Sequence, residues 1–277
     1  MRGSTPCANT RHMLFGGNTS CLQVDIPERQ ELLVFDCGTG IQNLGNHLCA
    51  DHGPQKGRIF ITHPHWDHIQ GFPFFKPFYD PKNTFDIHMP AQLEGGCKEV
   101  LTKYLAETFF PIGLDMMNSS ISCITQPSDR EDFSGFSVEY MWANHTIFTA
   151  MYKIRIGDKV IIFAPDNEIP TIQTPLALSW VNEFEAFIKD ADVLIHDAQY
   201  TNELYNERVG WGHTSWETII KCAQNASVKK LYLTHHDPDH GDEALLTLDK
   251  KVKGEWGQYF DAIEFVKEGT RVTLSID

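Results

Sequence analysis

Ile61-Thr-His-Pro-His-Trp-Asp-His68 brings three imidazoles and a carboxylate together within six residues. Imidazole and carboxylate ligands together suit zinc, iron or manganese. Residues two apart in an extended segment point to the same side, so His63 and His65 can bind one ion. Asp67 and His68 follow a bend in the chain and can face a second ion. A histidine-rich surface loop is the weaker interpretation, because the spacing and the preceding strand both agree with a metal site.

The residues before this motif predict a short buried strand. Gly57-Arg-Ile-Phe-Ile-Thr62 has the apolar pattern of such a strand, and Pro64 excludes a helix through the motif. A second strand is predicted at Glu31-Leu-Leu-Val-Phe-Asp36, followed by the turn Asp36-Cys-Gly-Thr-Gly40 and a helix from Ile41 to Leu48. The turn lacks the lysine and the longer glycine spacing of a P-loop. A loop that cradles phosphate is therefore the weaker interpretation of this turn.

Composition and charge limit the classes of function. A chain of 277 residues with 42% hydrophobic and 22% charged residues is long enough for one large α/β domain or two small ones. No apolar run approaches the ~20 residues that cross a bilayer, and no signal peptide is expected. Seven cysteines without a C-x-x-C pair are expected to be reduced thiols of a cytoplasmic protein. The net charge of −14 disfavours a large nucleic acid as partner, but bound metal cations would still allow a small anionic substrate.

His-x-His-x-Asp-His after a hydrophobic strand resembles the metallo-β-lactamase superfamily of metal-dependent hydrolases. The resemblance runs over nearly the whole chain and implies an αββα four-layer sandwich, with two mixed β-sheets flanked by helices, in a single domain over residues 1–277. The run from His235 to Asp242, His-His-Asp-Pro-x-His-x-Asp, resembles the phosphodiesterase-like branch. That branch is related to ribonuclease Z and to class II-type cyclic-nucleotide phosphodiesterases.

The resemblance also implies the ligands of two divalent ions, with zinc as the first choice and manganese or iron as alternatives. These ligands are His63, His65 and His145 on the first ion, Asp67, His68 and His235 on the second, and Asp166 as the bridge. His145 and Asp166 both follow segments predicted to be strands, where the family supplies ligands. His235 is the first histidine after another predicted strand, and His236 is the alternative ligand. The resemblance also implies that the turn at Asp36 is structural, with Asp36 bonding backbone and ligand groups.

Asp197 and His213 resemble a catalytic pair of ribonuclease Z and its phosphodiesterase relatives. Asp197 lies near the end of the predicted strand Ala191–Tyr200, and His213 lies in a glycine-histidine turn. The resemblance implies that the carboxylate fixes the tautomer of the imidazole and holds it charged near phosphate. Ribonuclease Z has glutamate at the position of Asp197, so the reach is one methylene shorter here. Asp67 is expected to orient the attacking hydroxide as well as to bind metal, and His196 is expected to be a buried histidine bonded to the backbone.

These features predict a metal-dependent hydrolase, specifically a phosphodiesterase that cleaves a small phosphodiester, with a cyclic nucleotide as the first choice, by a metal-bridging hydroxide. One alternative is ribonuclease Z-like processing of transfer RNA, which the charge and the lack of an evident basic arm disfavour. The others are a lactonase and a non-hydrolytic di-iron oxygen-binding protein. Relatives of the last kind have glutamate where His65 stands.

Three further expectations concern packing. Gly71-Phe-Pro-Phe-Phe-Lys-Pro-Phe-Tyr79 either fills the core or a subunit contact, which would support a homodimer, or forms an aromatic wall for a flat substrate group. The alternating stretch Arg271–Ile276 predicts a final strand. The histidines without sequence partners are expected at the surface or in packing, namely His12, His47, His52 and His88.

Overall fold

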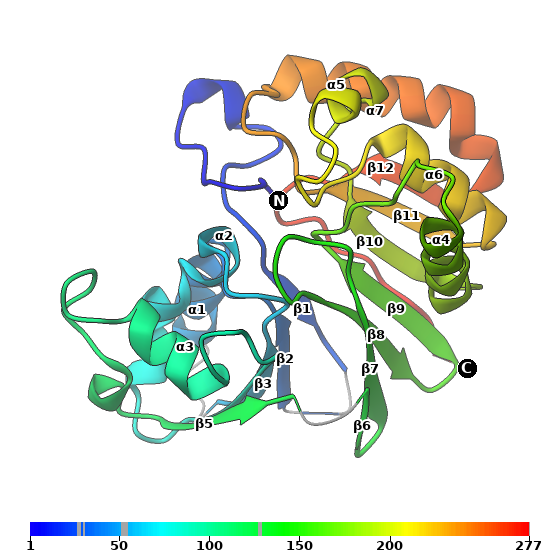
Figure 1. Ribbon diagram of the computed structural model, residues 1–277. Helices are drawn as coiled ribbons and strands as arrows, with labels where there is room; N and C mark the ends of the chain where they lie inside the picture. Colours follow the sequence, from blue (N-terminus) through cyan, green and yellow to red (C-terminus); the bar gives the residue numbers. More distant parts are fainter. Residues whose placement is uncertain (27–28, 30, 51–54, 127–128, 277) are drawn as a thin grey trace. The chain divides into compact units, whose positions relative to one another are not determined.

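The strands of the protein form two sheets, one in each of two compact units (Figure 1). The computed structural model describes residues 1–26, 29, 31–50, 55–126 and 129–276. The first-sheet unit comprises Asn18–Ser128, and the second-sheet unit comprises Met1–Gly17 together with Asp129–Asp277. The prediction of one domain concerns how these units associate, and it stays a prediction.

The first-sheet unit contains a mixed sheet with the strand order β1-β2-β3-β4-β5. The strands are β1 (Leu22–Val24), β2 (Glu31–Phe35), β3 (Lys56–Phe60), β4 (Thr84–Met89) and β5 (Ser120–Thr125). The β1–β2 pair is antiparallel, and the other pairs are parallel. Neighbouring residues of β2 and β3, such as Val34, Ile59 and Phe60, are completely buried. Because successive side chains of a strand point to opposite faces, both faces of these strands are covered, as is usual for parallel sheets.

Helices and short 3-10 turns supply the rest of this unit. They are α1 (Ile41–Ala50), α2 (Trp66–Ile69), α3 (Cys97–Tyr104), η2 (Phe72–Phe74), η3 (Lys76–Tyr79) and η4 (Leu114–Met116). The aromatic stretch forms η2 and η3, and Phe72, Phe75 and Phe78 are completely buried in the core. Phe74 is the exception, at 48% exposed. The stretch therefore fills the core of this unit, which was one of its two interpretations.

The second-sheet unit contains a mixed sheet with the strand order β12-β11-β10-β9-β8-β7-β6. The strands are β6 (Arg130–Phe133), β7 (Phe136–Trp142), β8 (Ala150–Ile156), β9 (Lys159–Ala164), β10 (Val193–Asp197), β11 (Lys230–Thr234) and β12 (Ala262–Phe265). The strands from β6 to β9 pair antiparallel, and those from β9 to β12 pair parallel. The β8–β9 hairpin turns at Gly157, whose φ of 58° suits glycine.

The α-helices described in this unit begin after a capping side chain in three cases out of four. They are α4 (Pro175–Ile188), α5 (Asn202–Glu207), α6 (Trp216–Asn225) and α7 (Asp242–Trp256), together with η1 (Thr10–His12) and η5 (Gly257–Tyr259). Thr174, Thr201 and Ser215 each precede a helix, and each side-chain oxygen accepts a hydrogen bond from a backbone N–H of the first turn. Such caps satisfy donors that have no partner within the helix.

The carboxyl ends of parallel strands put polar residues at one edge of each sheet. In the second-sheet unit, β9, β10 and β11 are adjacent and parallel, so Asp166, Asp197 and His235 all lie at the same edge. In the first-sheet unit, β2 and β3 are parallel, so Asp36 and Thr62 also emerge together. Ligand sites in open α/β sheets occur at such edges.

The predicted final strand is wrong. Arg271–Ile276 forms no strand, and Val272 is 40% exposed. Instead, β12 pairs with β11 and buries Ile263 and Phe265 against the core. The alternation of the last segment resembles that of a strand, but the segment has no buried face.

The predicted fold class is confirmed, since each unit has a mixed sheet with helices in the same unit. All seven cysteines lie in the described part of the chain and are free thiols. No helix formed by the described residues is both long and apolar enough to cross a bilayer.

Candidate metal centre

Asp36 anchors the ligand motif of the first-sheet unit. Its Oδ1 accepts hydrogen bonds from the backbone N (2.8 Å) and the hydroxyl (2.9 Å) of Thr62. Its Oδ2 accepts from the Ser20 hydroxyl at 2.7 Å and lies 2.7 Å from His68 Nδ1. The carboxylate is completely buried. Asp36 therefore bonds backbone groups and the imidazole of a proposed ligand, as the resemblance implied.

These contacts fix the tautomers of two imidazoles. Because a carboxylate only accepts, His68 Nδ1 donates to Asp36, and the lone pair of the neutral ring lies at Nε2. The Thr62 hydroxyl donates to Asp36 and so accepts from His63 Nδ1, which lies 3.0 Å away. The lone pair of His63 is therefore also at Nε2. Both rings have the form in which histidine binds a metal.

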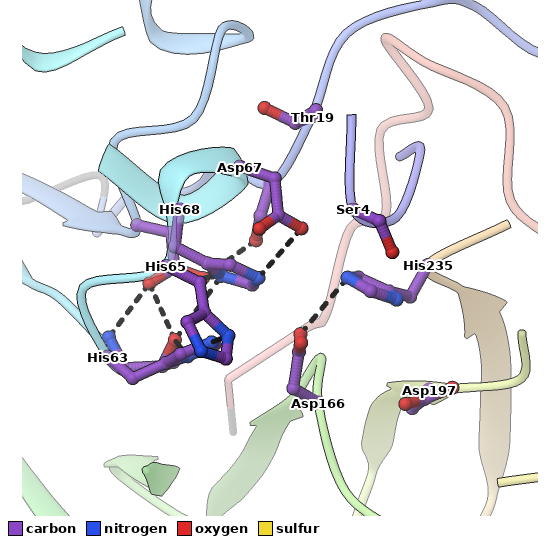
Figure 2. A network of polar contacts seen from close by, with 12 residues as sticks. Ser4, Thr19, His63, His65, Asp67, His68, Asp166, Asp197 and His235 are labelled. Carbon is purple, nitrogen blue, oxygen red and sulfur yellow. Dashed lines mark hydrogen bonds and ion pairs between the residues drawn. The ribbon is translucent and has the colours of Figure 1, made fainter. Parts of the chain in front are cut away.

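The ligating atoms of the motif converge in two pairs. His63 Nε2 and His65 Nδ1 lie 2.9 Å apart, and His68 Nε2 lies 3.2 Å from Asp67 Oδ2. Figure 2 shows these four side chains around the start of α2. One pair offers two imidazoles, and the other offers an imidazole and a carboxylate, as predicted for two ions.

In the second-sheet unit, Asp166 faces two imidazoles with different oxygens. His235 Nε2 lies 3.2 Å from Asp166 Oδ1, a contact drawn in Figure 2, and His145 Nε2 lies 3.8 Å from Asp166 Oδ2. His145 follows β7, Asp166 follows β9, and His235 follows β11. A carboxylate with its two oxygens directed to different histidines has the arrangement expected of a bridge between two ions.

Both imidazoles are held at Nδ1. His145 Nδ1 lies 2.9 Å from the carbonyl oxygen of Gly212, and His235 Nδ1 lies 2.9 Å from Gln199 Oε1. Neither acceptor has a proton to give, so Nδ1 carries the proton in both rings. The lone pair at each Nε2 is then directed to the side of Asp166.

Two glycines make room for these rings. A Cβ at Gly212 would lie 2.2 Å from His145 Nδ1, and a Cβ at Gly3 would lie 2.4 Å from His235 Nδ1. His235 itself has a φ of 57°, a left-handed conformation that costs a residue with a side chain about 1–3 kcal/mol. The backbone N of Gly3 donates to the carbonyl of His236 at 3.0 Å, which holds this turn in place.

The predicted pair Asp197 and His213 lies together beside His235. His213 Nδ1 is 2.7 Å from Asp197 Oδ2, so the shorter aspartate side chain still reaches the ring. The rings of His213 and His235 are stacked, with centroids 4.8 Å apart and planes inclined by 21°. One potential metal-binding atom from each of the three residues, a ring nitrogen or a carboxylate oxygen, lies within 4.8 Å of those of the other two. Asp197 Oδ1 also accepts from the backbone N of Gln199 at 2.9 Å.

Glu168 holds the turn that carries His213, and no motif predicted it. Its Oε1 accepts from the Tyr205 hydroxyl at 3.0 Å, and its Oε2 accepts from the backbone N of Gly212 at 2.9 Å. Gly210 N lies 2.9 and 3.0 Å from the two oxygens. The only sequence signal is a polar residue soon after a buried strand. Its partners are backbone groups, which a sequence does not reveal.

His236 and His196 have structural contacts instead of facing Asp166. His236 Nε2 lies 2.8 Å from the carbonyl oxygen of Val266, which leaves His235 as the better candidate ligand. His196 is completely buried, and its Nδ1 lies 2.7 Å from the backbone carbonyl of the following residue. Burial lowers the pKa of His196 to about 4, so this ring is neutral at pH 7. The prediction of a backbone-bonded histidine is confirmed.

The other histidines with no predicted role are ordinary surface or packing residues where they are described. His12 is buried and bonds the carbonyl of Pro238 at 3.0 Å, and His88 stacks on Phe60 with centroids 4.4 Å apart. His47 is exposed. His52 lies outside the described residues.

The chemistry of these donors fits divalent metal ions. Neutral imidazoles and carboxylates are ligands of zinc, which binds them at about 2.0–2.2 Å. Second contacts such as those of Asp36 and Gln199 are typical of metal-binding histidines. The two half-sets belong to different units, and the assignment of seven ligands to two ions stays a prediction.

Comparison with known proteins identifies the family. Residues 32–236 match the family model of the β-lactamase superfamily domain. The chain belongs to this family. Within the superfamily it is 23% identical to ribonuclease Z of Synechococcus sp. (strain CC9311), over 86% of this chain and 87% of that protein.

Solved structures of the superfamily have the same fold. The metallo-β-lactamase fold protein YhfI from Bacillus subtilis matches with a TM-score of 0.67 at 17% identity, over 97% of this chain and 94% of that one. Human tRNase Z, short form, matches with a TM-score of 0.65 at 16% identity, over 99% of each chain. The predicted family and fold are confirmed, and so is the coarser prediction of a superfamily hydrolase.

Replacing Asp36 tests its role behind the motif. We expect Asp36→Asn to lower metal affinity about 10–100-fold, because an amide cannot accept from all the groups that bond this carboxylate. The measurement is competition with a chromophoric chelator. Asp25→Asn, at an exposed position of the same unit, is the matched control. Wild-type affinity in Asp36→Asn would contradict the anchoring role.

Substitutions at two glycines of one turn distinguish the effect of backbone strain from the effect of displacing His145. Gly212 and Gly210 have φ values of 85° and 86°, but a Cβ at Gly210 would meet nothing within 4 Å. Both alanine variants should lose about 1–2 kcal/mol of unfolding free energy from backbone strain. Only Gly212→Ala should also weaken metal binding, by about tenfold or more, because its methyl group displaces a ligand. Equal metal affinity of the two variants would show that His145 is not a ligand.

Proposed function

We propose that this superfamily hydrolase is a divalent-metal-dependent phosphodiesterase that acts on a small phosphodiester, with a cyclic nucleotide as the first candidate. The observation that carries the proposal is the Asp197–His213 pair beside His235. A phosphodiester has a poor leaving alkoxide, and its transition state gathers negative charge. An imidazole backed by a buried carboxylate can serve both needs, since it can donate a proton and can stabilise phosphoryl oxygens.

The proposed ligands are the seven side chains expected from the family. They are His63, His65 and His145 for one ion, Asp67, His68 and His235 for the other, and Asp166 for both. When bound, the ions supply Lewis acidity and lower the pKa of water from ~15.7 towards ~7. Asp67 is proposed to orient the attacking water through its carboxylate. Zinc is the first choice of metal, with manganese or iron as alternatives.

His213 is proposed to handle the proton of the leaving group. Its Nδ1–H is held by Asp197 Oδ2 at 2.7 Å, so Nε2 is the ring atom that exchanges a proton with the substrate. Asp197 accepts from Nδ1–H both before and after Nε2 gives up its proton, so the ring keeps its orientation during the transfer. After donation, the same contact keeps the ring in the tautomer that accepts a proton again.

His213→Ala should lower turnover about 10²-fold or more, because the proton donor to the leaving group is lost. Metal content should stay at the wild-type level, since the variant retains every proposed ligand. The measurements are the rate with bis(p-nitrophenyl) phosphate and metal analysis of the same sample. His47→Ala, at an exposed position, serves as the control. Unchanged turnover would show that the assignment of His213 is wrong.

A second candidate is ribonuclease Z-like processing of transfer RNA, favoured by the similarity to ribonuclease Z. The charge opposes it, because 23 basic residues stand against 37 acidic ones. RNA binding depends on neutralising several phosphates with lysine and arginine. The small phosphodiester therefore remains the first proposal.

A substrate panel with zinc and with manganese decides between these functions. It contains cyclic mononucleotides, cyclic dinucleotides, bis(p-nitrophenyl) phosphate, a precursor transfer RNA and a lactone. We expect hydrolysis of at least one cyclic nucleotide and no hydrolysis of the lactone. Cleavage of the RNA alone would favour the second candidate. Lactone hydrolysis alone, or a visible iron–oxo band without hydrolysis, would overturn both.

A further inference from the structure

A cavity in the second-sheet unit lies beside the candidate ligand His145. Its volume is about 490 Å³, within the range of roughly 300–1,000 Å³ that small-molecule sites occupy. His145 and Gly212 both line it, and the carbonyl of Gly212 is the acceptor that holds His145 Nδ1. The cavity therefore adjoins a residue proposed to act at the reaction centre.

The walls of the cavity are mainly apolar. Ile172, Leu176 and Val209 line it and are 64%, 82% and 61% exposed, respectively. Trp180 lines it as well and is stacked on the buried Phe184, with centroids 5.4 Å apart and planes inclined by 8°. Exposed apolar side chains that gather around a cavity are typical of ligand-binding sites.

The charged groups of the cavity select against an anionic occupant. None of the described residues that line it is lysine or arginine. Glu168 lines it, but both of its oxygens accept hydrogen bonds from Tyr205, Gly210 and Gly212. A phosphate group therefore finds no basic side chain among the described residues that line this cavity, whereas an uncharged flat group has apolar walls to contact. Thr146 and Thr171 add hydroxyl groups that can bond ring nitrogens or carbonyls.

We infer that this cavity binds the aromatic or heteroaromatic arm of the substrate phosphodiester, a group of nucleobase size. The inference rests on the proposed function, and it makes nucleotides better substrates than phosphodiesters of plain sugars or alkyl groups. Base binding by apolar and aromatic walls is tolerant of base identity, so we expect a preference for a base over none.

The test compares two ligands that differ only in the base. Adenosine 5′-monophosphate and ribose 5-phosphate are titrated into the metal-loaded protein by calorimetry. We expect the nucleotide to bind about tenfold more tightly or better. Equal affinities would overturn the inference.

Variants then locate the effect. The double variant Ile172→Ala/Leu176→Ala removes two of the exposed apolar side chains that line the cavity. The affinity for the nucleotide should then exceed the affinity for ribose 5-phosphate by only about threefold or less. Leu178→Ala is the matched control. Leu178 lies on α4 like Leu176, is 43% exposed and does not line the cavity. An undiminished advantage in the double variant would place the base elsewhere. No advantage in the wild type, with a change of sedimentation in the double variant, would instead assign the surface to a second copy of the chain.

The outcomes for cavity and function are separable. If the nucleotide keeps its advantage but no phosphodiester in the panel is hydrolysed, the cavity is retained and the proposed reaction is wrong. If phosphodiesters are hydrolysed but the base adds no affinity, the reaction is retained and the cavity assignment is wrong.

Discussion

A neutral imidazole presents a lone pair at Nε2 only while its proton is held at Nδ1, and the candidate centre depends on the groups that hold it. Asp36 holds His68, and the carbonyl of Gly212 holds His145. Gln199 holds His235. A carboxylate, a backbone carbonyl and a side-chain amide thus perform the same task. Each acceptor can hold the proton at Nδ1 only if its own position is fixed. The folded edges of the two sheets therefore determine which nitrogen of each ring can bind a metal.

The same edges carry backbone strain at corresponding positions. Asp36 immediately follows β2 and His235 immediately follows β11, with φ values of 62° and 57°. In both cases a parallel strand ends and the chain turns sharply into a loop of the candidate centre. Side chains other than glycine adopt this conformation at a cost of about 1–3 kcal/mol, which persists only when surrounding contacts determine the geometry. The contacts are the bonds of Asp36 to Thr62 and the fit of His235 against Gly3. The strain at these turns lowers the free energy of unfolding, but the turns fix the directions of the Asp36 carboxylate and the His235 ring.

The sequence predicted local features better than the contacts between distant segments. The motif from His63 to His68 is recognisable because its proposed ligands lie within six residues. The role of its anchor Asp36 was expected from the resemblance to the family. The side chains that face His145 and His235, such as Asp166 and Gln199, come from distant parts of the sequence, and only the resemblance to a family proposed these two histidines as ligands.

Features built from backbone groups escaped prediction. Glu168 binds the N–H groups of Gly210 and Gly212, and the sequence records no such partner. Gly212 is needed because of the ring that lies against it, and this contact joins segments far apart in the chain. The strand predicted at Arg271–Ile276 is wrong for a different reason. The alternation of the segment is strand-like, but no surface formed by the described residues buries one of its faces.

Charge restricts the kind of phosphodiester that such a centre can accept. Two divalent cations would offset only part of the net charge of −14, and their field acts mainly on the phosphate next to them. A polynucleotide brings many further phosphates, each of which would have to approach an acidic surface without compensation. A substrate with one or two phosphodiesters would need no such compensation, because its charge would lie next to the proposed metal ions. Its remaining surface is sugar and base, and the cavity beside His145 offers that surface apolar walls without lysine or arginine among its described residues. The proposed cations for the phosphate and the proposed cavity for the base would therefore be complementary, and together they support the proposal of a small nucleotide over a polynucleotide.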